Sequence, residues 1–239
     1  MLKNNHTKHL ICVRHGESEY NKKNLFTGLY DAKLTYKGKN EATVAAKLCK
    51  DYTIDHAYCS ALIRARSTLD TMIQHYGHIE TEISAALNER NYGELTGMNK
   101  VEACKIYGAD KVHQWRRGFH DKPPSGESLA DTLERVTNFY QTNIVKRLKY
   151  DTTNSILIVA HGNSLRALAG HLLGADEQAF TNIEVAWCSP WIFKFNHNKL
   201  SGLEIVNNPN VVGKNQLFDQ SKVEVIKRSD QCPNTFLPA

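Results

Sequence analysis

The chain has 239 residues, with 30 Lys and Arg against 25 Asp and Glu, so its formal net charge is +5. Hydrophobic residues make up 41%, charged residues 23% and aromatic residues 9%, which excludes collagen, wholesale disorder and a coiled coil. The longest apolar run, residues 156–160, is far shorter than the roughly 20 residues that cross a bilayer, so we expect no membrane partner. The first residues do not form a secretory signal, and we therefore expect a cytoplasmic protein.

The six cysteines contain no C-x-x-C pair, which argues against a zinc ribbon and a thioredoxin-type redox site. In the expected cytoplasmic setting they should be reduced thiols. Cys12 and Cys59 lie in apolar, strand-like segments, where cysteine behaves as a small buried hydrophobic residue.

Apolar runs and helical spacing alternate along the chain. A strand is predicted at residues 10–13, a helix over 35–50, a strand at 55–60, a helix capped by Ser60 and reaching residue 76, and a short strand at 79–83. A long amphipathic helix is then predicted over 128–148 and a fully buried strand at 156–160. Next comes a helix capped by Asn163 and ended by Gly174, and a last strand at 190–195.

This alternation predicts one α/β domain over residues 1–239, a three-layer sandwich with a mostly parallel central sheet flanked by helices. Residues 87–125 lack a clean period and hold several Gly and Pro residues, so we expect an insertion over the active site. After Gly202 the chain turns polar, and residues 203–239 are predicted to form a C-terminal tail.

Two predicted strands end in the same way, because each runs into a His-Gly pair at His15 and His161. Ligands of parallel α/β sheets bind beyond the carboxyl ends of the strands, so both imidazoles should project into one crevice. Glycine after each histidine permits a tight turn and a close approach of the backbone to a ligand. A single histidine of this kind more often only ends a strand, but two in one chain favour a functional site.

Arginines accompany these histidines: Arg14 precedes His15, Arg64 follows the second predicted strand, and Arg90, Arg116 and Arg117 lie further along. Guanidinium groups match phosphate oxygens bidentately, so this set predicts a pocket for one or two phosphate groups. Each arginine alone is better explained by a solvated surface position, and only the set as a whole favours a phosphate pocket.

Several known classes of phosphate chemistry are excluded because the sequence lacks their motifs. Gly38-Lys39 and Gly213-Lys214 do not complete a P-loop, and Cys59 and Arg64 are one residue too close for a cysteine phosphatase loop. No paired carboxylates beside the histidines suggest a metal. The mechanism that remains is a direct attack of an imidazole on phosphorus, with Glu89 as the acid that protonates the leaving oxygen. We expect an oxyanion-rich pocket to raise the pKa of Glu89, although an ion pair with a neighbouring arginine explains Glu89 equally well.

A family resemblance rests on these residues. Residues 14–18 (RHGES), Asn21 and residues 26–28 (FTG) resemble the opening signature of the histidine phosphatase superfamily, and more narrowly the cofactor-dependent (2,3-bisphosphoglycerate-dependent) phosphoglycerate mutases. Residues 87–97, 115–117, 126–129 and 161–168 extend the similarity, which covers roughly residues 10–195 in family order. The match is to a short form, since only Ser125 stands where many members carry a longer segment.

Three positions depart from the family pattern. Tyr20 stands where the mutases usually have Trp, and Ile63 stands where they usually have a polar or basic residue. Residues 185–190 (VAWCSP) do not reproduce the Thr-Gly-Val-Pro of the mutases and are closer to the broader phosphatases.

The resemblance implies a phosphoglycerate mutase-like fold and the interconversion of 3-phosphoglycerate and 2-phosphoglycerate in glycolysis and gluconeogenesis. It implies a phosphohistidine intermediate primed by 2,3-bisphosphoglycerate, with no metal. His15 would carry the phosphoryl group and Glu89 would exchange protons, while His161, Arg14 and Arg64 would hold the phosphoryl group in transfer. The implied substrate-binding residues are Ser18, Asn21, Thr27, Gly28, Arg90, Tyr92, Lys100, Arg116, Arg117, Gly162 and Asn163.

Two other hypotheses stay open at this point. One is a phosphomonoesterase of the same superfamily that acts on small phosphate esters, in which water receives the phosphoryl group. The other is a non-catalytic binder of phosphate or nucleic acid, against which stands the absence of a basic stretch interleaved with aromatic residues. We therefore expect phosphoglycerates as partners and no nucleic acid, with a monomer and a homodimer both compatible with the sequence.

Overall fold

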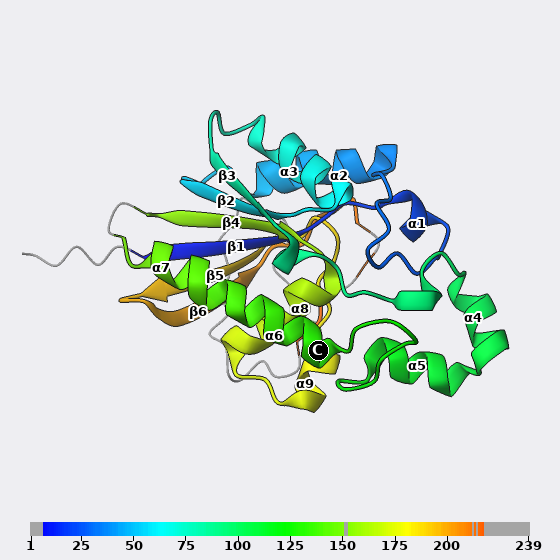
Figure 1. The fold of residues 1–239 in the computed structure, drawn as a ribbon. Helices are drawn as coiled ribbons and strands as arrows, with labels where there is room; N and C mark the ends of the chain where they lie inside the picture. Colours follow the sequence, from blue (N-terminus) through cyan, green and yellow to red (C-terminus); the bar gives the residue numbers. More distant parts are fainter. Residues whose placement is uncertain (1–6, 151–152, 212, 214, 218–239) are drawn as a thin grey trace, which may run out of the picture.

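A six-stranded sheet forms the centre of the computed structural model, which describes residues 7–150, 153–211, 213 and 215–217 (Figure 1). The strand order is β3-β2-β4-β1-β5-β6. The strands are β1 (Lys8–Arg14), β2 (His56–Ser60), β3 (Glu80–Ser84), β4 (Ser155–Ala160), β5 (Trp191–Asn196) and β6 (Lys199–Ile205). Strands β1 to β4 pair in parallel, whereas β5 and β6 pair antiparallel at one edge. The prediction of a mostly parallel sheet is therefore confirmed.

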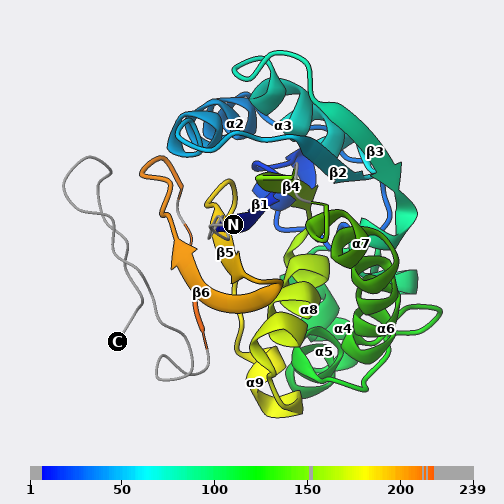
Figure 2. The same ribbon diagram turned by 90° about the vertical axis from the view of Figure 1, so that its left-hand side faces the viewer.

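Helices cover both faces of this sheet. They are α1 (Glu19–Lys22), α2 (Tyr36–Leu48), α3 (Ile63–Ile73), α4 (Lys100–Tyr107), α5 (Ala109–Arg117), α6 (Leu129–Phe139), α7 (Val145–Leu148), α8 (Gly162–Leu173) and α9 (Glu177–Thr181). Two short 3-10 helices, η1 (Ala85–Leu87) and η2 (Gly93–Leu95), and a π-helical segment, η3 (Tyr140–Ile144), complete the set. Figure 2 shows α2 and α3 on one face and α6, α7 and α8 on the other, so the three-layer sandwich is confirmed.

Each face of the sheet has its own apolar core, because successive side chains of a strand point to opposite faces. On β1, Leu10 and Cys12 pack into the core beneath α6 and α8, whereas Ile11 and Val13 pack beneath α2 and α3. Burial raises the pKa of the Cys12 thiol, in keeping with its predicted role as a small buried hydrophobic residue.

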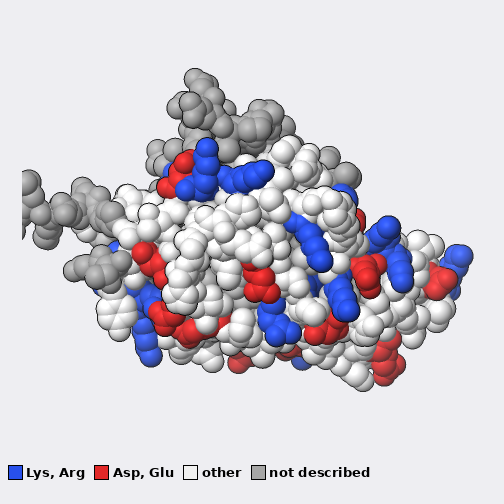
Figure 3. Space-filling model, turned by 90° about the horizontal axis from the view of Figure 1, so that it is seen from above, with Lys and Arg blue, Asp and Glu red and all other residues white. Residues whose placement is uncertain are grey.

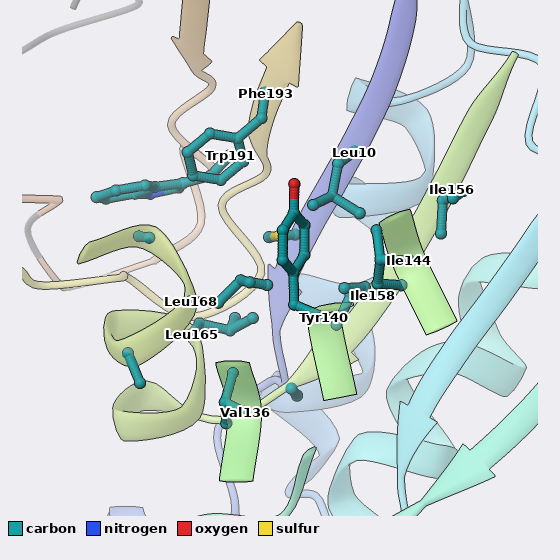
Figure 4. Close-up of a cluster of buried hydrophobic side chains, with 14 of the residues drawn as sticks. Leu10, Val136, Tyr140, Ile144, Ile156, Ile158, Leu165, Leu168, Trp191 and Phe193 are labelled. Carbon is teal, nitrogen blue, oxygen red and sulfur yellow. The ribbon is translucent and has the colours of Figure 1, made fainter. Parts of the chain in front are cut away.

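The helix predicted over residues 128–148 is present but is interrupted by one π turn, η3. Figure 4 shows Tyr140 and Ile144 from this turn beside Leu10, Ile156 and Ile158 of the sheet. Tyr140 and Ile144 are 7% and 0% exposed. Both side chains therefore remain in the core, as their four-residue spacing predicts, whereas the wider turn itself leaves no signal in that spacing.

Two predicted helix caps are wrong. Leu62, and not Ser60, precedes the first turn of α3, because Ser60 is still the last residue of β2. His161 caps α8 in place of Asn163, which lies inside the helix. Gly174 ends α8 in the left-handed conformation with φ +64, as predicted.

The predicted boundary of the C-terminal tail is also wrong. Residues 203–205 belong to β6, where Leu203 and Ile205 are 0% and 1% exposed. Their side chains complete the core at the antiparallel edge of the sheet. Most of the predicted tail, residues 218–239, lies outside the described residues.

Residues 87–125 pass through the end of η1, then η2, α4 and α5. Leu95, Ala103, Val112 and Trp115 of this segment form a small separate core with Phe26. Figure 1 shows α4 and α5 beyond the end of the sheet from which β1 leads into α1. This segment stands beside the carboxyl ends of the parallel strands.

Candidate active site

The two predicted histidines meet at the carboxyl ends of β1 and β4. These strands are parallel neighbours with Arg14 opposite Ala160, so the residues that follow, His15 and His161, leave the sheet side by side. Their ring centroids are 4.9 Å apart, and both side chains are buried. The two imidazoles are therefore neighbours, as expected from the paired strand ends, but neither lines the pocket described below.

The protonation of His15 follows from its contacts. Its Nδ1 lies 2.7 Å from the carbonyl oxygen of Gly16, which can only accept a hydrogen bond, so the proton of the neutral ring sits on Nδ1. Nε2 keeps its lone pair and accepts a hydrogen bond from Arg64 Nε at 3.3 Å. Burial and the charges of Arg64 and Arg14 hold the pKa of His15 well below its usual value. The ring is therefore neutral, with the lone pair of Nε2 facing a guanidinium group.

The loop after His15 is fixed by a buried network. The amide of Gly16 donates to Thr68 Oγ1 at 3.1 Å, and the Thr68 hydroxyl donates to the carbonyl of Arg64 at 2.8 Å. A Cβ on Gly16 would lie 2.2 Å from the carbonyl oxygen of Gly38. Glycine at this position thus allows the loop to pack against the first turn of α2.

His161 is held by Ser60. Its Nε2 lies 2.7 Å from Ser60 Oγ, and that hydroxyl donates to Asn88 Oδ1 at 2.8 Å. Since the hydroxyl proton points to Asn88, Nε2 of His161 is the donor toward Ser60. Nδ1 of His161 is buried without a hydrogen-bond partner among the described residues. Burial, followed by the charge of Arg64, lowers the pKa of His161 well below its usual value.

Two arginines bracket the histidines. Arg64 is fully buried and donates to the carbonyls of Tyr30 and Gly28 at 2.8 and 2.9 Å. Burial lowers its pKa to about 10, so it remains charged at neutral pH. Arg14 donates to the carbonyl of Val185 at 2.9 Å and stacks against Trp187, with 5.4 Å between the guanidinium carbon and the ring centroid. The segment that departs from the family pattern therefore supports Arg14.

A pocket opens beside these residues at the strand ends. Most of the predicted substrate-binding residues line it, together with others that the sequence did not single out. The lining consists of Arg14, Asn21, Leu25, Phe26, Thr27, Gly28, Glu89, Tyr92, Lys100, Arg116, Arg117, Gly162, Asn163, Arg166 and Glu184.

His15, Arg64 and His161 are not part of that lining and are buried behind it. Two predicted substrate-binding residues also lie outside it. Ser18 is buried and caps α1, with its hydroxyl on Asn21 Oδ1 at 2.9 Å. Arg90 Nη2 donates to Tyr92 Oη at 3.1 Å and to the carbonyl of Arg116 at 3.0 Å, so it supports two lining residues from behind.

Glu89 lies in the pocket wall between the backbone amides of Arg90 and Asn163, which both donate to its Oε1, at 2.9 and 3.1 Å. The expectation of a raised pKa is wrong for the pocket as described. Burial alone would raise the pKa of Glu89, but the charge of Arg14, the amide of Arg90 and the charge of Arg64 bring it below the usual value. The pocket is rich in cations, and the carboxylate is its counter-charge.

Sequence reasoning missed four residues of this region. Ser60 and Thr68 orient His161 and the loop after His15, and a search for polar residues beyond each parallel strand end would have found Ser60. Arg166 and Glu184 line the pocket and pair with each other at 3.0 Å. Arg166 stands in the matching segment 161–168, whereas Glu184 had no signal in the sequence.

One grouping in the described residues could offer three ligand atoms to a metal, namely His56, Glu80 and Glu82. It lies at the amino end of β2 and β3, away from the pocket. Arg147 Nη2 pairs with Glu82 Oε1 at 2.9 Å, the same oxygen that faces His56 Nε2 at 3.0 Å. The carboxylates already have a cationic partner there. No helix in the described part of the chain is long and apolar enough to cross a membrane.

Comparisons with known proteins agree with this geometry. The profile of the histidine phosphatase superfamily (branch 1) matches residues 10–208. A 2,3-bisphosphoglycerate-dependent phosphoglycerate mutase of Cytophaga hutchinsonii is 43% identical over 208 residues, which cover 84% of this chain and 95% of that protein. A phosphoglycerate mutase of Schizosaccharomyces pombe is 41% identical over 204 residues, or 83% of this chain and 96% of that protein.

Among solved structures, a putative alpha-ribazole-5'-P phosphatase of Escherichia coli has the same fold. It superposes with a TM-score of 0.72 at 23% identity, covering 87% of this chain and 98% of that one. The matched range, the relatives and the histidine pair together show that the chain belongs to the histidine phosphatase superfamily (branch 1), in the family of the 2,3-bisphosphoglycerate-dependent phosphoglycerate mutases.

Proposed function

We propose that this chain interconverts 3-phosphoglycerate and 2-phosphoglycerate in the cytoplasm, through a phosphohistidine on His15. The observation that carries the proposal is the neutral His15 ring, whose Nε2 lone pair faces Arg64 beside a cation-lined pocket. The names of the mutase relatives support this substrate over other phosphate esters.

His15 acts as the nucleophile. Its Nδ1 proton is committed to the Gly16 carbonyl, so the Nε2 lone pair, once released by Arg64 Nε, forms a bond to phosphorus while the ester P–O bond breaks. Arg64 Nε, which lies 3.3 Å from Nε2, then donates to a phosphoryl oxygen. In the reverse step a substrate hydroxyl attacks phosphorus, the N–P bond breaks, and its electron pair returns to Nε2.

Glu89 moves the proton. As a carboxylate it takes the proton of the attacking hydroxyl, and as a carboxylic acid it returns that proton to the leaving oxygen. A phosphoryl group in the pocket brings negative charge toward Glu89 and opposes Arg14 and Arg64, which now lower its pKa. Loading the pocket thereby moves the pKa of Glu89 toward the range that proton exchange requires.

The pocket fits a bisphosphorylated primer. 2,3-Bisphosphoglycerate supplies the phosphoryl group that charges His15. Nδ1 of His161 is buried and has no hydrogen-bond partner among the described residues. Once the ring is protonated, Nδ1 donates a hydrogen bond to an anionic oxygen of the ligand. A second anionic group on the ligand finds Lys100, Arg116 and Arg117 in the pocket wall.

The surface is consistent with a small anionic substrate. On the face shown in Figure 3, the described Lys and Arg side chains lie among Asp and Glu and form no continuous basic band. Binding along a nucleic-acid backbone requires such a band. The cations that the proposal uses are those that line the pocket.

A coupled assay tests the proposal. Purified protein is given 3-phosphoglycerate, with and without a trace of 2,3-bisphosphoglycerate, and 2-phosphoglycerate is measured through enolase. We expect product formation that depends on the primer. Release of inorganic phosphate without 2-phosphoglycerate would overturn the mutase assignment in favour of a phosphomonoesterase.

Labelled bisphosphoglycerate tests the nucleophile. The wild-type protein should give an acid-labile, alkali-stable phosphoenzyme that His15→Ala cannot form. His75→Ala is the matched control, because His75 is exposed and outside the pocket. Stoichiometric labelling of His15→Ala would refute the assignment of His15.

A further inference from the structure

One carboxylate in the pocket wall has no part in the chemistry above. The lining carries the cations Arg14, Lys100, Arg116, Arg117 and Arg166, with the carboxylates of Glu89 and Glu184 among them. Glu89 serves proton transfer in the proposed function. Glu184 stands directly before residues 185–190, the segment that departs from the family pattern.

Glu184 is paired with two of these cations. Its Oε1 accepts from Arg117 Nη1 and, at 3.0 Å, from Arg166 Nη2. Arg166 is also held by Asn163 Oδ1 and the Ile183 carbonyl, both at 2.7 Å, so its guanidinium group is fixed. The charge of Glu184 therefore opposes the two guanidinium charges on this side of the pocket.

This pair lies on the solvent side of the pocket. The side chains of Arg117 and Glu184 are 34% and 30% exposed, whereas Arg64, next to His15, is fully buried. A phosphoryl group in transfer at His15 occupies the inner end. Any second anionic group of a small ligand must then lie further out, among Lys100, Arg116 and Arg117.

The charge of Glu184 acts on that second group. Although burial raises its pKa, the charges of Arg166 and Arg117 hold the pKa of Glu184 below the usual value, so it is ionised at neutral pH. A carboxylate at the outer end of the ligand brings one negative charge toward Glu184, whereas a second phosphate brings nearly two. Like charges repel in proportion to their product, so the bisphosphate is disfavoured more strongly.

We propose that Glu184 is a selectivity residue of this pocket: its negative charge beside Arg117 and Arg166 weakens the binding of doubly phosphorylated three-carbon acids relative to singly phosphorylated ones. The inference rests on the proposed function for the class of ligand. Its consequence is that the primer binds more weakly than the cations of the pocket alone would allow, which favours its release and reorientation.

Binding calorimetry on Glu184→Gln tests this. The amide keeps an oxygen that can accept from Arg117 but removes the charge. We expect 2,3-bisphosphoglycerate to bind about threefold to tenfold tighter than to the wild type, with a smaller change for 3-phosphoglycerate, and the difference to shrink at high salt. Glu177→Gln is the matched control. Glu177, the first residue of α9, pairs with His120 outside the pocket wall, and its side chain is 64% exposed.

Unchanged or weaker binding of the bisphosphate to Glu184→Gln would overturn the inference, since Glu184 would then only position Arg117. Glu184→Ala is the second variant if Gln disturbs folding, and tighter bisphosphate binding there supports the same conclusion. Both proteins carry His15→Ala for the calorimetry, so the bisphosphate binds without transferring its phosphoryl group and the two proposals fail separately. Absence of mutase activity in the wild type removes the proposed function, whereas an unaltered bisphosphate affinity removes only the selectivity of Glu184.

Discussion

Replacing Ser60 with Ala should impair the catalytic role of His161 while leaving the histidine itself in the sequence. The Ser60 hydroxyl accepts from His161 Nε2 at 2.7 Å and from the Leu62 amide at 3.2 Å, and it donates to Asn88 Oδ1 at 2.8 Å. Ser60 and His161 are both 0% exposed, so water cannot take the place of the hydroxyl without a rearrangement. The variant leaves the imidazole N–H unsatisfied and its ring free to turn away from His15.

The magnitude follows from the lost hydrogen bonds. A buried donor left unsatisfied costs about 1–3 kcal/mol, so the free energy of unfolding should fall by that amount. A charged hydrogen bond from His161 to the transferring phosphoryl group has a strength of about 1.5–3 kcal/mol, which corresponds to roughly 10- to 150-fold in kcat. Because the ring is retained, some activity should remain, in contrast to His15→Ala.

Urea unfolding and the primer-dependent coupled assay measure the two effects. Thr132→Val is the control: Thr132 is also 0% exposed, and its hydroxyl donates only to the Ser128 carbonyl within α6, at 3.1 Å. The Ser128 carbonyl still accepts from the Thr132 amide at 3.3 Å, so Thr132→Val leaves no buried donor unsatisfied and should change stability less than Ser60→Ala, with kcat unchanged. Ser60→Thr, which keeps the hydroxyl, should recover most of the activity. Wild-type kcat in Ser60→Ala, at any loss of stability, would refute the positioning of His161 by Ser60.

Three further outcomes are expected. Glu89→Gln should lower kcat about 100-fold or more while inorganic phosphate still binds by calorimetry; near-normal turnover would exclude Glu89 as the proton carrier. Because burial and neighbouring charge hold the pKa values of His15 and His161 well below 6.5, the unfolded chain binds more protons, and stability is lost as pH falls below about 6.5. Each histidine should contribute about 1 kcal/mol of loss between pH 6.5 and 5.5, and a smaller loss in His161→Gln by urea unfolding checks the sign. Gly170→Ala should cost about 1–3 kcal/mol in thermal or urea unfolding, because its Cβ would lie 2.1 Å from the Phe180 ring; an unshifted midpoint would contradict the packing.

Much of the fold follows from local patterns. The apolar runs that predicted strands at 10–13 and 156–160 became β1 and β4, because a strand in the middle of a sheet covered by helices on both sides buries both of its faces. The His-Gly pairs at their ends had to meet, since adjacent parallel strands end at the same edge of the sheet. The sequence did not predict the π turn at η3, because the turn depends on the contacts of Tyr140 and Ile144 with the sheet and not on local helix propensity.

The residues that surround the histidines depended on packing. Ser60 carries the local signature of a helix cap, yet its hydroxyl serves His161, which is 101 residues away along the chain. Arg90 belongs to the matching motif but supports Tyr92 from behind the pocket wall.

The sequence by itself determined the sandwich, the two histidines and the excess of cations near them, because strand burial and residue type are local properties. Only the tertiary structure decided the tautomer of His15, the lowered pKa of Glu89 and the entry of Glu184 into the pocket. These depend on which groups lie within a few ångströms across the fold, and hydrogen bonds and charge interactions in a buried site are set by those distances.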